Sequence, residues 1–201
     1  MSEPTILIVP GLRDHVARHW QTLLIARLPR VRGVQPMGRE DLDCAARVAA
    51  IERAAQAVQG PLIIVAHSGG CIMLAHWAMQ TQREVQGALL ATPPDFESPM
   101  PEGYPSIDAL QASGWLPVPR KPLPFRSIVA ASRNDPLGEY GRVAELASHW
   151  GSELVDLGEV GHLNPASGFG EWPQAQSLID HLIATPVPLN VDHRAREEMK
   201  P

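Results

Sequence analysis

The stretch LIIVAHSGGC, residues 62–71, is an apolar run that ends at a serine set among small residues. Residues 72–79 follow it directly and have the composition of a helix. A strand, a sharp turn and a helix in this order are typical of a nucleophile elbow, in which a serine hydroxyl projects from the carboxyl edge of a sheet. The stretch therefore predicts an α/β fold with Ser68 at the turn.

Such a turn needs small residues two positions before and two positions after the serine, because strained backbone brings the strand and the helix close together. Ala66 and Gly70 meet this need, although glycine is the usual residue at the first position. The N–H of Gly69, at the start of the helix, is then free to donate to an oxyanion. The turn alone also fits a simpler interpretation, in which Ser68 only caps the helix, since serine is a favoured N-cap residue.

Further apolar runs along the chain are typical of parallel strands that are covered on both faces. They occur at residues 5–9, 62–66, 87–91 and 127–131, with weaker candidates at 34–37 and 153–157. Segments with helical periodicity lie between them, at residues 17–28, 42–58, 70–79, 140–150 and 173–183. Strands that alternate with helices predict an α/β fold with a mostly parallel sheet.

The size and composition of the chain favour one domain. Its 201 residues, 44% of them apolar and 19% charged, are enough for a single substantial core. We expect this domain at residues 1–184, followed by a flexible tail at 185–201, which is Pro-rich and then charged.

The segment 93–124 holds nine of the twenty prolines and predicts a long ordered loop, with one short helix at 107–112. Loops of this length commonly serve function, so the segment could form a modest cap or pocket wall. A plain surface excursion is an equally good interpretation.

Charge and terminal sequence exclude several classes of partner. The net charge is -5, and the arginines are scattered among acidic residues, so we expect no nucleic acid partner. The first residues lack the basic start and the apolar core of a signal peptide, and no apolar run has the length of a membrane span. Two cysteines, Cys44 and Cys71, are too few for a disulfide framework. We therefore expect a cytoplasmic protein without a membrane partner.

A nucleophilic serine needs a base to take its proton and an acid to orient that base, and in α/β folds of this kind they follow in the order serine, acid, histidine. Asp135 lies in a polar turn, SRNDP at 132–136, directly after the predicted strand 127–131. Ligand crevices form at this end of parallel strands, which makes Asp135 the candidate acid. Taken alone, the turn also reads as an ordinary Asx turn.

His162 is the candidate base. It lies in the glycine-flanked loop GEVGHLN at 158–164, after the predicted strand 153–157. The other histidines lie on or beside predicted helices, in the tail or directly before the serine, although a loop histidine alone is often a surface residue. The second oxyanion donor should be the N–H of Leu12, because Gly11 permits close approach of the loop after the first strand.

A metal site is a competing interpretation of His15 and His19, which are four residues apart on one predicted helical face. The motif lacks the glutamate of zinc proteases and has no third ligand at a recognisable spacing, so we expect no metal and instead His19 packed near Trp20. No glycine loop for phosphate is present, so we expect no cofactor. Cys71 should face the core as a buried thiol.

The chain resembles the small serine hydrolases grouped with retinoblastoma-binding protein nine. The motifs that carry the resemblance are VPG at 9–11, HWQ at 19–21, AHSGG at 66–70, SRNDP at 132–136, GHLN at 161–164 and SGFGEW at 167–172. The resemblance implies a catalytic triad of Ser68, Asp135 and His162. It also implies a three-layer α/β-hydrolase fold with about six strands, helices on both faces and no large lid.

The residues and the resemblance together predict a serine hydrolase that cleaves a small ester, thioester or amide through an acyl-enzyme. Its expected partner is a small-molecule acyl substrate, and a homodimer is left open. Two alternatives stay open as well: a non-catalytic interaction module on the same scaffold, and an acyltransferase.

Overall fold

The computed structural model of the chain describes residues 3–38 and 40–184, so the tail expected at 185–201 lies outside the described residues. Six parallel strands form one sheet in the order β2-β1-β3-β4-β5-β6. The strands are β1 Thr5–Val9, β2 Val31–Gly33, β3 Leu62–His67, β4 Gly87–Ala91, β5 Ser127–Ala131 and β6 Glu153–Asp156. The helices are α1 Trp20–Arg27, α2 Cys44–Gln56, α3 Gly69–Ala78, α4 Ile107–Ala112, α5 Tyr140–Trp150 and α6 Gln174–Ala184.

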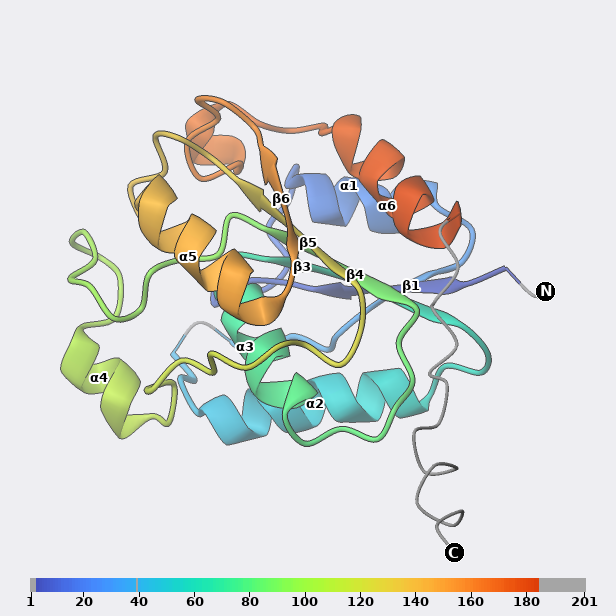
Figure 1. Cartoon of the computed structure of the whole chain (residues 1–201), viewed down its shortest axis with the longest axis horizontal. Coiled ribbons are helices and arrows are strands. Elements are labelled where there is room, and N and C mark those ends of the chain that lie inside the picture. Colours follow the sequence, from blue (N-terminus) through green and yellow to red (C-terminus); the bar gives the residue numbers. More distant parts are fainter. Residues whose placement is uncertain (1–2, 39, 185–201) are drawn as a thin grey trace, which may run out of the picture.

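Helices cover both faces of the sheet and make the molecule a three-layer structure. Helices α2, α3 and α5 lie on one face, and α1 and α6 lie on the other (Figure 1). Neighbouring residues of a strand point to opposite faces, so Ile64 of β3 packs in the core beneath α2 and α3, and Ile63 packs in the core beneath α6. Covering on both faces explains why β1, β3, β4 and β5 read as nearly continuous apolar runs.

The second strand differs from its prediction. The apolar pattern predicts it at 34–37, whereas β2 is Val31–Gly33 and pairs with only three residues of β1. Pro36 has no N–H for a strand ladder, which disfavours the predicted position. Because β2 is a short and partly exposed edge strand, it lacks the apolar run that marks the central strands.

Helix α1 begins three residues later than its periodicity predicts. Arg18 has φ of 62°, and His19 is extended with φ of -70° and ψ of 142°, so neither residue is helical. The backbone N–H of Gln21 donates to Nδ1 of His19 at 3.2 Å, and the imidazole thereby acts as the N-cap of α1.

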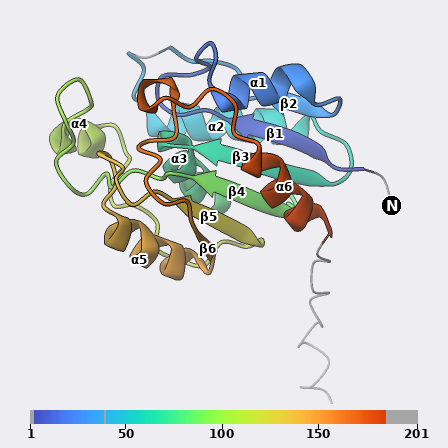
Figure 2. The same ribbon diagram turned by 90° about the horizontal axis from the view of Figure 1, so that it is seen from above.

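The segment 93–124 runs from β4 to β5, and its helix α4 lies at the end of the sheet to which the arrowheads of β3 and β4 point (Figure 2). The segment is anchored at several points. The fully buried Trp115 donates from Nε1 to the carbonyl oxygen of Leu42 at 2.7 Å, and Trp150 of α5 donates to the carbonyl oxygen of Pro119 at 2.8 Å.

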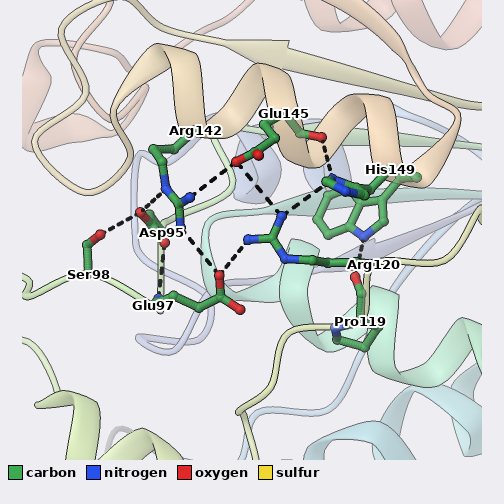
Figure 3. Close-up of polar contacts among 9 residues, drawn as sticks. Asp95, Glu97, Ser98, Pro119, Arg120, Arg142, Glu145 and His149 are labelled. Atoms are coloured by element: carbon green, nitrogen blue, oxygen red, sulfur yellow. Dashed lines mark hydrogen bonds and ion pairs between the residues drawn. The ribbon is translucent and has the colours of Figure 1, made fainter.

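Charged side chains also join the two ends of the segment 93–124 to helix α5 (Figure 3). Arg142 of α5 contacts Asp95 at 3.1 Å and Glu97 at 3.4 Å, and Glu97 also pairs with Arg120. Glu145 lies 3.2 Å from Arg142 on the same helix. The segment is therefore fixed against α5 at both of its ends.

None of the helices within 3–38 and 40–184 combines the length and the hydropathy that crossing a lipid bilayer requires.

Candidate active site

Ser68 lies between the end of β3 and the start of α3 in a strained backbone conformation, with φ of 57° and ψ of -134°. Non-glycine residues adopt such angles at a cost of about 1–3 kcal/mol, and only where the surrounding structure holds them. The N–H of Ser68 donates to the carbonyl oxygen of Ala91 in β4 at 3.0 Å. Its hydroxyl makes no capping hydrogen bond to α3, so the interpretation of Ser68 as a side-chain cap is wrong.

Small residues allow this turn in the way that the sequence suggests. A methyl group on Gly70 would lie 2.6 Å from the carbonyl oxygen of Pro10 and 2.7 Å from that of Val9. Backbone atoms cannot move aside easily, so glycine is needed at this position. Ala66 is completely buried, and its methyl group belongs to the core beneath α2 and α3.

The structure brings Ser68, His162 and Asp135 together although they come from three separate loops. The hydroxyl of Ser68 lies 2.8 Å from Nε2 of His162, and Nδ1 of His162 lies 2.8 Å and 3.0 Å from the two carboxylate oxygens of Asp135. A carboxylate only accepts, so Nδ1 carries a proton and the neutral imidazole accepts from Ser68 at Nε2. The backbone N–H of Leu137 donates to Asp135 at 2.9 Å and fixes the carboxylate.

The loop that carries His162 is held on three sides. The N–H of His162 donates to the hydroxyl of Ser167 at 3.0 Å, and the N–H of Gly161 donates to the side-chain oxygen of Asn134 at 2.6 Å. On the third side, Nε2 of His67 donates to the carbonyl oxygen of His162 at 3.0 Å. These contacts fix the imidazole of His162 relative to Ser68, since they hold the backbone of His162 and of Gly161.

The loop after β1 lies against the serine turn, as the sequence predicts for an oxyanion site. A methyl group on Gly11 would lie 3.0 Å from Cβ of Ser68, and one on Gly69 would lie 2.9 Å from Cγ of Leu12. Neither the N–H of Leu12 nor that of Gly69 donates a hydrogen bond within residues 3–38 and 40–184. Both donors are therefore available beside the hydroxyl of Ser68.

A cleft of about 680 Å³ opens over Ser68 and His162. Residues of the segment 93–124 form its apolar wall, namely Pro94, Phe96, Met100, Tyr104 and Pro105. Arg13 lies over the ring of Tyr104, 5.0 Å from its centroid, and joins this wall to the loop after β1. The segment is thus a pocket wall, which decides between the two interpretations of its sequence.

Two further histidines lie in the cleft: His67 lies next to His162, and His19 lies next to His67. The ring of His67 lies 4.9 Å from the ring of His162 and 4.5 Å from the ring of His19. Burial, together with the charge of His162 and of His15, lowers the pKa of His19 to about 4. Burial, followed by the charges of His162 and His19, lowers the pKa of His67 well below its usual value.

Two other residues from the sequence analysis take structural positions. The thiol of Cys71 is buried and donates to the carbonyl oxygen of Ala91 at 3.4 Å, and burial raises its pKa well above the usual range. His15 contacts the carbonyl oxygen of Val34 at 3.0 Å through Nε2, while His19 caps α1, so the two imidazoles do not converge on a ligand. Within the described part of the chain, no group of three or more His, Cys, Asp or Glu side chains could hold a metal ion.

A sequence model for serine hydrolases matches residues 6–181 of the chain. The chain belongs to the serine hydrolase family. No match is found among curated proteins.

Several solved structures resemble this serine hydrolase over most of its length. A YdeN-like hydrolase from Pectobacterium atrosepticum is 30% identical, with a TM-score of 0.75 and 90% of each chain covered. The ydeN gene product of Bacillus subtilis is 16% identical, with a TM-score of 0.66, 91% of this chain covered and 100% of the other. The mouse α/β hydrolase domain-containing protein 10 is 14% identical, with a TM-score of 0.69 and 90% of each chain covered. The fold is therefore a minimal α/β-hydrolase fold with a sheet of six strands.

His67, His19 and Gln21 also line the cleft of this serine hydrolase, although their sequence pattern does not predict them as residues of the site. The motif HWQ at 19–21 contains His19 and Gln21, but it indicates a role for them only through the resemblance to the family. The position of His67 directly before Ser68 gave no indication that its ring contacts the loop after β6.

Proposed function

We propose that this serine hydrolase cleaves a small ester, thioester or amide through an acyl-enzyme on Ser68. Oγ of Ser68 attacks the carbonyl carbon while its proton passes to Nε2 of His162, which then delivers the proton to the leaving group. Water repeats the sequence with His162 as base and releases the acid. Asp135 holds the tautomer of His162 and stabilises its cationic form.

The observation that carries this proposal is the pair of short contacts on one imidazole, 2.8 Å to the hydroxyl of Ser68 and 2.8 Å to the carboxylate of Asp135. A serine hydroxyl is a weak nucleophile unless a positioned base takes its proton. The free N–H groups of Leu12 and Gly69 support the same reaction, because two donors at this place would stabilise the negative oxygen of a tetrahedral intermediate.

Labelling with a fluorophosphonate probe tests the proposal directly, since the probe reacts only with an activated serine. We expect the wild type to be labelled and Ser68→Ala to remain unlabelled. The kcat of Ser68→Ala on a reactive ester should fall by at least about 10³-fold. Ser152→Ala is the matched control, because the hydroxyl of Ser152 bonds Ser127 at 2.6 Å at the start of β5, the opposite end of that strand from the site. Folded wild-type protein that takes up no label would favour a non-catalytic interaction module.

Within the family, we propose a place beside the hydrolases grouped with retinoblastoma-binding protein nine. Support comes from the sequence motifs around His19, Asp135 and His162. The proposed acceptor is water, and product analysis in the presence of competing alcohols separates a hydrolase from an acyltransferase.

A further inference from the structure

Two buried polar side chains in the cleft, His19 and Gln21, each have one polar atom bound and one polar atom free. Their exposed fractions are only 6% and 2%, and both side chains line the cleft over Ser68. Nδ1 of His19 accepts from the backbone N–H of Gln21, and Nε2 of Gln21 donates to the carbonyl oxygens of Val9 and Val65 at 3.1 Å each.

These contacts decide what the two free atoms can do. Because Nδ1 of His19 accepts a hydrogen bond, the proton of the neutral imidazole is on Nε2, which is therefore a donor. Because the amide NH₂ of Gln21 faces two carbonyl oxygens, its Oε1 is directed away from them and is an acceptor. Neither atom has a hydrogen-bond partner within residues 3–38 and 40–184.

Both free atoms lie at the surface of the cleft. The enclosed side-chain atoms without a partner in the described residues belong to His15, Trp20 and Thr92, not to His19 or Gln21. Because hydrogen bonds hold both side chains in place, a donor and an acceptor that face the cleft can bind a polar group of a ligand in place of water.

We propose that Nε2–H of His19 and Oε1 of Gln21 form a subsite that binds a neutral hydroxyl group of the substrate. The oxygen of a hydroxyl group can accept a hydrogen bond from Nε2–H of His19, and its O–H can donate one to Oε1 of Gln21. One hydroxyl group therefore satisfies both atoms. An anion would find no positive charge on these two side chains, because burial lowers the pKa of His19 to about 4, and Oε1 of Gln21 would repel it. The inference rests on the proposed function and names the class of its substrate: an ester, thioester or amide that carries a hydroxyl group.

The subsite is close to the reacting groups. The ring of His19 contacts that of His67, which in turn contacts that of His162, with centroid distances of 4.5 Å and 4.9 Å. His67 also directly precedes Ser68 in the chain. A hydroxyl group a few bonds from the scissile carbonyl can therefore reach His19 while the carbonyl lies at Ser68.

Paired esters that differ only in hydroxyl groups test the subsite. One pair is glycerol monobutanoate and butyl butanoate, which differ on the alcohol side, and the other is methyl 3-hydroxybutanoate and methyl butanoate, which differ on the acyl side. We expect the wild type to prefer the hydroxylated member of at least one pair by about tenfold or more in kcat/KM, since an unfilled donor and acceptor penalise the plain ester. Equal rates within both pairs would overturn the inference.

His19→Asn is the decisive variant, because the asparagine oxygen can still cap α1 while the donor at Nε2 is lost. We expect the preference to fall to within about threefold. His15→Asn is the matched control: His15 lies in the same loop, outside the cleft, and its replacement should leave the preference intact. A preference that survives in folded His19→Asn would contradict the proposed role.

Binding to Ser68→Ala keeps the subsite testable without turnover. We expect glycerol monobutanoate or methyl 3-hydroxybutanoate to shift the NMR signal of the His19 Nε2–H, and the plain esters to leave it in place. Absence of a shift with both hydroxylated esters overturns the subsite even if fluorophosphonate labels the wild type. If the hydroxylated esters shift the His19 signal but fluorophosphonate does not label the wild type, the proposed hydrolase activity is overturned and the subsite is supported.

Discussion

One methyl group at the serine turn decides whether α3 can approach the loop after β1. A side chain on Gly70 would meet the carbonyl oxygens of Pro10 and Val9 at 2.6–2.7 Å, and both belong to the backbone. We expect Gly70→Ala to lower the free energy of unfolding by about 2–3 kcal/mol, because the chain must shift to admit the methyl group. Denaturation by urea measures the change.

Gly170→Ala is the control for this substitution. A methyl group there would lie 3.7 Å from the carbonyl oxygen of Arg18, an ordinary contact distance. We expect a change within about 0.5 kcal/mol. Similar losses in the two variants would show that the contact with Pro10 and Val9 is not the reason for glycine at position 70.

Sequence predicted the central part of the candidate site because each residue follows a predicted strand. Ser68, Asp135 and His162 follow β3, β5 and β6, and the carboxyl ends of parallel strands share one edge of the sheet. His19 and Gln21 could not be placed in this way, because they cap and begin α1, which meets the cleft at its N-terminus and follows no strand directly. Their free atoms are evident only when every hydrogen bond of the two side chains is known.

Among the elements, the segment 93–124 is joined to α5 by charged side chains as well as by buried apolar ones such as Phe96 and Val118. Arg142 contributes most to this network, since it contacts Asp95, Glu97 and Glu145 (Figure 3). Such partly exposed ion pairs are worth about 1 kcal/mol or less each, so we expect Arg142→Met to change global stability little. The segment itself should loosen, and KM should rise because its residues form the cleft wall.

Hydrogen exchange of the amides in 95–104 measures this loosening, and exchange in Arg142→Met should be faster, as it should in wild-type protein at high salt. Arg133→Met is the control, because it removes an exposed ion pair with Asp156 that lies outside the network. Unchanged exchange in Arg142→Met would mean that the tryptophan hydrogen bonds and the apolar packing hold the segment without the ion pairs.

The central strands are easier to predict from sequence than the edge strand β2, because the central strands are buried and β2 is partly exposed. Strands β1, β3, β4 and β5 are buried along their whole length, and their apolar runs mark them in the sequence. The edge strand β2 is three residues long and partly exposed, so its position depends on pairing with β1 and not on its own side chains. The periodicity of the sequence within 31–37 does not indicate that pairing.

For the molecule as a whole, the two neutral histidines make stability depend on pH. An unfolded histidine has a pKa near 6.5, whereas burial lowers the pKa of His19 in the folded protein to about 4. Between these values the unfolded chain binds a proton that the folded chain does not, so the free energy of unfolding falls as the pH falls. This contribution is fully present above about pH 6.5 and is lost progressively toward pH 4. His67 acts in the same direction, because burial lowers its pKa too.

We expect His19 alone to reduce the free energy of unfolding by about 2 kcal/mol between pH 7 and pH 5. Urea denaturation at several pH values in this range measures the slope, above the range in which most carboxylates titrate. His19→Asn should have a shallower slope than the wild type, because it lacks the imidazole that the folded state keeps neutral. If His19→Asn and the wild type lose stability equally between pH 7 and pH 5, then burial does not lower the pKa of His19. Its imidazole would then be charged below about pH 6.5, and the preference of the subsite for a neutral hydroxyl over an anion would no longer follow.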